Sequence, residues 1–119
     1  MSYEELSEKS KKSIDEKVKN FMDDSKTIDL LSGIFKVLGD PTRLKIIYAL
    51  SQSPLCVTDI SRILKMSQSS ISHQLALLRN KELIKVERVG RKAIYSLDDD
   101  HVISLFREGY EHAEHKKNN

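Results

Sequence analysis

Three of the four histidines of this 119-residue chain lie near its C-terminus, together with a cluster of acidic residues. The segment reads DDDHVISLFREGYEHAEH and contains two pairs of potential metal ligands, Asp99 with His101 and His112 with His115. Imidazole nitrogens and carboxylate oxygens are typical donors of a tetrahedral zinc site. Asp99, His101, His112 and His115 are therefore the candidate metal ligands.

The two pairs lie too far apart to bind one ion within a single chain. On one helix, His101 and His112 are separated by about 16.5 Å along the axis, whereas the ligands of one zinc ion lie about 3–3.5 Å from each other. Both histidines nevertheless face the same side of that helix, within about 20°. An antiparallel helix from a two-fold-related subunit would bring each Asp99 and His101 to the partner's second pair. The spacing thus predicts a homodimer with metal ions shared between its subunits.

Each candidate ligand also has a simpler explanation. Asp99 could serve only as a helix N-cap, and His112 and His115 could be cations favoured near a helix C-terminus. Their joint spacing favours a metal site over these explanations. Three nitrogens and one oxygen favour zinc, with cobalt or nickel as alternatives.

The histidine spacing argues against an enzyme. HAEH places its histidines at i, i+3, whereas the zinc-hydrolase motif HExxH needs i, i+4 and a neighbouring glutamate. A site with four protein ligands also leaves no open position for a substrate water. We therefore expect a binding protein without catalytic residues.

The sequence around these ligands predicts the elements that must position them: a mainly α chain with one β-hairpin. Gly39, Asp40 and Pro41 end one helix and begin the next. The period of apolar residues changes to two over residues 83–97, where two strands turn at Gly90 and Arg91. Such a hairpin directly after a helix-turn-helix predicts a winged helix-turn-helix fold. The predicted helices cover residues 25–38, 41–51, 57–64, 69–81 and about 100–115.

The helix over residues 69–81 has the character of a DNA-reading helix. Its outward arc is small and polar, and the N-terminal residues of such a helix meet base edges in the major groove. Basic side chains on the hairpin can reach phosphates. Gln68 and Ser69 could instead simply cap the helix, but the surrounding pattern favours DNA contact. The predicted DNA-binding residues are Gln68, Ser69, Ser72, His73, Arg88, Arg91 and Lys92.

Charge is segregated along the chain in a way that fits both the predicted DNA binding and the predicted metal binding. Residues 30–97 carry four acids and eleven bases, and residues 98–115 carry six acids and one base. A basic middle suits an anionic partner, and an acidic end suits a cation. The competing explanation is that these charges merely solvate a small domain.

Composition further limits the class of protein. The sequence has no apolar run of membrane-spanning length and no signal peptide, so we expect a cytoplasmic protein without membrane contact. Cys56 is the only cysteine, which excludes an intramolecular disulfide and a Cys-rich zinc site. Residues 1–25 are expected to form a charged arm or accessory helix, and residues 26–119 one winged-helix domain.

From about Lys26 onward, the sequence resembles the ArsR/SmtB family of winged-helix, metal-sensing repressors. The resemblance lies in IFKVLGDPTRLKII, CVTDISRIL, SQSSISHQLALL, GRKAIYSLDDDH and the Asp-x-His…His-x-x-His helix. It implies that the metal-free dimer binds inverted-repeat, double-stranded operator DNA. Zinc or cobalt at the dimer interface would then weaken DNA binding and release metal-efflux or sequestration genes from repression. Carried over residue by residue, the resemblance implies that the metal ligands are Asp99, His101, His112 and His115, and that the DNA-reading residues are Gln68, Ser69, Ser72 and His73.

The sequence departs from one branch of this family. Relatives that sense cadmium and lead have a Cys-x-Cys motif before the recognition helix, and here that position reads Cys56-Val57-Thr58. A thiolate site is therefore absent, and Cys56 is expected to be a small buried residue. A constitutive winged-helix regulator without a metal response is the alternative function.

Overall fold

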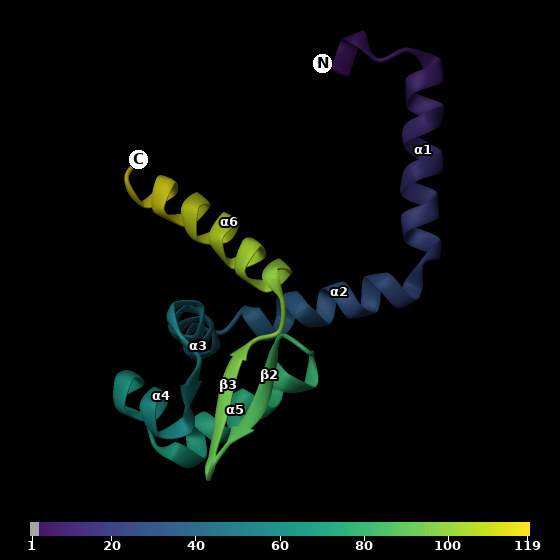
Figure 1. The fold of residues 1–119 in the computed structure, drawn as a ribbon. Helices are drawn as coiled ribbons and strands as arrows, with labels where there is room; N and C mark the ends of the chain where they lie inside the picture. Colours follow the sequence, from purple (N-terminus) through teal and green to yellow (C-terminus); the bar gives the residue numbers. More distant parts are fainter. Residues whose placement is uncertain (1–2) are drawn as a thin grey trace. The chain divides into compact units, whose positions relative to one another are not determined.

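The structure is a computed structural model that describes residues 3–119 (Figure 1). It divides into two compact units, one ending at Gly33 and one comprising Ile34–Asn119. A short 3-10 helix, Tyr3–Glu5, comes first. The elements that follow are α1 (Glu8–Asp23), α2 (Ser25–Leu38), α3 (Pro41–Gln52), β1 (Leu55–Cys56), α4 (Val57–Leu64), α5 (Gln68–Asn80), β2 (Ile84–Val89), β3 (Lys92–Leu97) and α6 (Asp100–Lys117).

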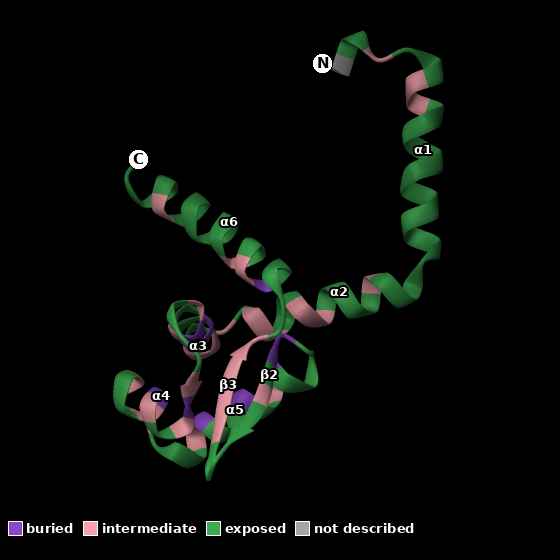
Figure 2. Cartoon of the chain, viewed as in Figure 1, coloured by how far each residue is buried: buried purple, intermediate pink, exposed green. Residues whose placement is uncertain are grey.

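The first unit contains α1 and most of α2. Ser7 caps α1 by accepting a hydrogen bond from the Ser10 amide, and Asp24 accepts one from the Thr27 amide at the start of α2. No residue of α1 is buried (Figure 2). Of the two expected forms of this segment, an arm or a helix, residues 8–23 adopt the helix. The predicted domain boundary after residue 25 stays a prediction.

The core of the second unit lies where α3, α4, α5 and the sheet meet (Figure 2). Asp40 caps α3 by accepting from the Arg43 amide, and Pro41 occupies the first turn, as the sequence predicts. The inward stripe of α5 is confirmed, because Ile71, Leu75 and Leu78 are almost fully buried. The fully buried side chains are Ile46, Ile47, Ile60, Ile71, Leu75 and Leu78.

The predicted hairpin is confirmed as β2 and β3, which run side by side in Figure 1. Gly90 sits at its turn with a φ of +63°, a backbone conformation that glycine adopts at little cost. Leu55 and Cys56, between α3 and α4, also form a strand, β1. It pairs with β3 and gives an antiparallel sheet of order β1-β3-β2. Sequence periodicity misses β1 because two residues are too few to show alternation.

These elements form the winged helix-turn-helix that the sequence predicts. α4 and α5 make the helix-turn-helix, and β2 and β3 make the wing. Within residues 3–119, every helix is too short or too polar to cross a lipid bilayer.

Candidate DNA-reading and metal-binding surfaces

The start of α5 presents polar side chains that the helix itself does not need. Ser67 is the N-cap, and its hydroxyl accepts a hydrogen bond from the Ser70 amide at 3.1 Å. Gln68 and Ser69 are therefore not required as caps, contrary to the simpler explanation of their presence. Both are exposed in the first turn, where a helix in the major groove meets base edges.

The outward face of α5 continues with residues at helical spacing. Ser72 and His73 are exposed, opposite the buried stripe. Arg79 lies on the same arc as Ser72, two turns further along. It lines a polar hollow of about 380 Å³ between α5 and Tyr95 of β3. Arg79 is not among the predicted DNA-binding residues, although its position seven residues after Ser72 places it on the same exposed arc.

Local hydrogen bonds fix the start of α4, the first helix of the helix-turn-helix. The Asp59 carboxylate accepts from the Cys56 thiol at 3.1 Å and from the Cys56 amide at 3.2 Å, at the start of α4. The thiol contact, followed by the amide contact, lowers the pKa of Asp59. Cys56 is buried, as predicted. Lys65 then ends α4 in a left-handed conformation, which turns the chain toward α5.

The wing carries exposed basic side chains at its tip. Arg88 lies opposite Ala93, and Lys92 lies opposite Val89 beside the turn. Arg88, Arg91 and Lys92 are all exposed, and in the described part of the chain none of them forms a salt bridge. The charges of Arg88 and Arg91 are therefore available to an anionic partner, while Lys92 also helps to lower the pKa of Asp59.

At the other candidate site, Asp99 uses one carboxylate oxygen and leaves the second largely available. Its Oδ1 caps α6 by accepting from the amides of His101 and Val102, at 2.9 and 3.3 Å. Its Oδ2 lies 3.4 Å from the His101 Nδ1. Partial desolvation acts to raise the pKa of Asp99, but the bonds from His101 and Val102 outweigh it and lower the pKa. Asp99 is thus the N-cap of α6 through Oδ1, and its Oδ2 lies beside the exposed His101 imidazole, where both could face one cation.

The second ligand pair lies at the opposite end of α6. His112 and His115 are exposed in its last turns, and the His101 side chain is 96% exposed at its start. Within residues 3–119 of one chain, no three His, Cys, Asp or Glu side chains come together to hold a metal. The donor types fit zinc, but one chain brings together only half of the set.

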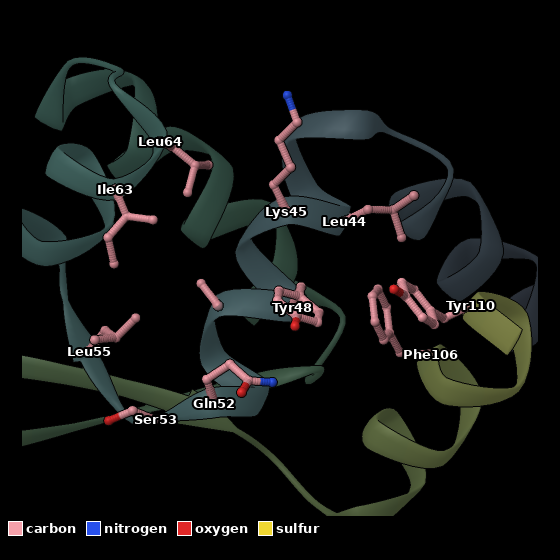
Figure 3. Close-up of a pocket in the computed structure, with 11 residues that line it drawn as sticks. Leu44, Lys45, Tyr48, Gln52, Ser53, Leu55, Ile63, Leu64, Phe106 and Tyr110 are labelled. Atoms are coloured by element: carbon pink, nitrogen blue, oxygen red, sulfur yellow. The ribbon is translucent and has the colours of Figure 1, made fainter. Parts of the chain in front are cut away.

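The rest of α6 packs its other side against the chain's own core. Val102 is buried, and the rings of Tyr48, Phe106 and Tyr110 lie beside one another (Figure 3). Their centroids are 6.0 to 6.4 Å apart, and they border an apolar groove of about 980 Å³ that α3, α4 and α6 line. Leu105 lies between His101 and His112 on the same face of α6 and is 36% exposed. This face of α6 therefore remains accessible to another molecule.

Comparison with known proteins gives consistent similarities. Residues 40–86 match the profile of the family described as bacterial regulatory protein, arsR family. A transcriptional repressor SmtB homolog of Synechocystis is 45% identical over 82 residues, which cover 69% of this chain and 62% of that protein. The matched region thus spans less than two thirds of that relative's length. The HTH-type transcriptional regulator NmtR of Mycobacterium tuberculosis is 41% identical over 92 residues, 77% of each chain.

Solved structures show the same similarity. The solution structure of apo-NmtR superposes with a TM-score of 0.67 over 77% of each chain, at 41% identity. The homodimeric winged helix-turn-helix domain of Mb0332 from Mycobacterium bovis, a possible ArsR-family regulator, gives a TM-score of 0.76. It is 25% identical and covers 80% of this chain and 89% of that domain.

Proposed function

Because this chain belongs to the ArsR/SmtB family of winged helix-turn-helix transcriptional regulators, we propose that it is a metal-responsive repressor acting as a homodimer. The zinc-free dimer binds an inverted-repeat operator, and zinc, or cobalt or nickel in its place, weakens that binding. Genes for metal efflux or sequestration are the proposed targets. The observation that carries the metal assignment is the exposed half-site at each end of α6.

DNA binding is assigned to α5 and the wing. Gln68, Ser69, Ser72 and His73 reach base edges or phosphates from α5, and their exposure together with capping by Ser67 supports this role. Arg88, Arg91 and Lys92 contact phosphates from the wing. Since these contacts release counterions, operator affinity should fall steeply as salt is added.

Metal binding is assigned to two symmetric sites, each shared by two chains. Asp99 and His101 of one subunit and His112 and His115 of its partner supply the ligands. A bound zinc ion would supply four coordinate bonds that tie the two α6 helices together. Asp99 can cap α6 through Oδ1 and ligate through Oδ2 at the same time, which keeps the start of the helix ordered.

The metal response is a coupling between the two surfaces. Tying the α6 helices favours a dimer whose α5 helices no longer match successive half-sites. Such coupling is reciprocal, so operator DNA must weaken zinc affinity by the same factor, commonly about 5- to 150-fold.

The test is an equilibrium zinc titration of the dimer with and without an inverted-repeat operator. We expect two zinc ions per dimer and a lower zinc affinity on DNA. His112→Ala should abolish the zinc effect and keep operator binding, while Ala substitution of His73 should weaken operator binding and keep zinc binding. An operator affinity that zinc leaves unchanged in the folded dimer would refute the metal response.

The alternative is a constitutive DNA-binding regulator. It is favoured by one observation: the two amide hydrogen bonds at Asp99 fully explain an acidic residue at that position. In that case the wild-type and His112→Ala proteins would hold the operator equally well, with or without zinc.

A further inference from the structure

One guanidinium connects three helices of the second unit. Arg43, in the first turn of α3, donates from Nε to the Val37 carbonyl at 2.6 Å. It also donates from Nη1 to the Gln74 side-chain oxygen at 2.9 Å. Val37 lies in the last turn of α2, and Gln74 lies in the middle of α5. Arg43 and Gln74 are both half-buried, so water competes little for these bonds.

The bond to Val37 satisfies a need of the backbone. In a continuous helix the Val37 carbonyl would accept from the amide four residues later. That residue is Pro41, which has no N–H. Arg43 supplies the missing donor, which fixes its guanidinium at the end of α2 and leaves Nη1 directed at Gln74.

The bond to Gln74 reaches the helix that carries the predicted DNA contacts. Gln74 follows His73 directly and lies on the flank between the exposed arc and the buried stripe of α5. Apolar contacts of Ile71, Leu75 and Leu78 hold α5 on the core, but such contacts are not directional. A hydrogen bond to a charged group has a defined geometry, so this one restricts rotation and sliding of α5.

We infer that Arg43 and Gln74 are positioning residues, whose hydrogen bond holds α5 against the end of α2 in the orientation that reads DNA. The inference rests on the DNA-binding part of the proposed function and is independent of metal. Neither side chain needs to touch DNA. Loss of the bond should therefore weaken operator binding by a protein that is still folded.

The test compares two Gln→Met variants in zinc-free protein. Gln74→Met removes the acceptor with little change in shape, and operator affinity should fall about tenfold, from the usual strength of a hydrogen bond to a charged group. Gln52→Met is the matched control, because the Gln52 amide donates its hydrogen bond to the neighbouring Ser51 hydroxyl and not to α5. The operator affinity of this variant should equal that of the wild type. Thermal unfolding checks that both variants are folded at the assay temperature.

Two further readouts separate positioning from direct contact. The dependence of operator affinity on salt should have the wild-type slope in Gln74→Met, because no phosphate contact is lost. Arg43→Lys combined with Gln74→Met should bind no more weakly than Arg43→Lys alone, because the Arg43–Gln74 bond that Gln74→Met removes is already lost with the guanidinium. A reduced salt slope, or losses that add, would mean separate contacts with DNA and would overturn the inference.

The outcomes also separate this inference from the proposed function. If the wild type binds operator and Gln74→Met binds equally well, only the positioning role is wrong. If zinc does not affect the wild type, the metal response is wrong and the zinc-free comparison still decides the positioning role. If the wild type binds no DNA, both are wrong.

Discussion

Asp99 gives the sharpest test of the metal site, because its two carboxylate oxygens have separable tasks. Oδ1 accepts from two amides of α6, and Oδ2 is available to a metal. Asn is as good an N-cap as Asp, but it offers a neutral amide in place of the charged ligand. Ala removes both the cap and the ligand. The pair Asp99→Asn and Asp99→Ala therefore distinguishes a cap from a cap that also binds metal.

The two substitutions should differ in their effect on thermal stability but not in their effect on zinc affinity. Losing the cap in Asp99→Ala should lower the melting temperature of the zinc-free protein by about 5 °C, whereas Asp99→Asn should stay within about 2 °C of the wild type. Both variants should lose zinc affinity by about 100-fold or more, because even groups that merely orient a metal ligand contribute about 10- to 100-fold.

The assays are thermal unfolding by circular dichroism and zinc competition against a chelator. Asp40→Asn is the matched control, because Asp40 caps α3 through the same kind of contact, at 3.0 Å to the Arg43 amide, and lies outside the predicted site. It should change neither property appreciably. If Asp99→Asn binds zinc as tightly as the wild type, Asp99 is a cap alone and the assignment of this ligand is refuted.

Four further predictions concern pH, the α6 pairing and the wing. Because histidine binds a metal in its neutral form, zinc affinity should fall as the pH is lowered, measured by the same competition at stepwise lower pH. The pKa of Asp99 is lowered in the folded protein, so its charged carboxylate stabilises α6 at neutral pH. This stabilisation is lost as the pH falls through the lowered pKa. The melting temperatures of the wild type and Asp99→Ala should therefore converge at a pH below the ordinary pKa of an aspartate. A Cβ atom at Gly109 would meet nothing within 4 Å in the single chain, so Gly109→Leu should preserve the helical content but weaken the dimer in sedimentation equilibrium. An unchanged dimer would exclude close pairing of the two α6 helices at this position. Arg91→Ala should reduce the slope of log affinity against log salt by about 0.9, and an unchanged slope would remove Arg91 from the phosphate contacts.

Most of this fold could be predicted from the sequence, because the sequence signals for its helices and its hairpin are local. The stop at Gly39, the cap at Asp40 and the stripe of Ile71, Leu75 and Leu78 each depend on neighbours within one or two helical turns. Periodicity alone is enough to choose which face of such a helix is buried. Helical spacing likewise predicts that the four candidate metal ligands lie at the two ends of one helix. They are then too far apart to bind one ion within a single chain.

The tertiary structure decided what depends on distant partners. Strand β1 exists because Leu55 and Cys56 meet β3, about forty residues later in the chain. The hydrogen bond from Arg43 to Gln74 joins residues 31 positions apart, and it depends on how α3 packs against α5. Side-chain hydrogen bonds require positions accurate to a fraction of an ångström, and only the packed core sets such positions. Residue types and helical spacing thus determined the available chemistry, and packing decided which side chains were left free to perform it.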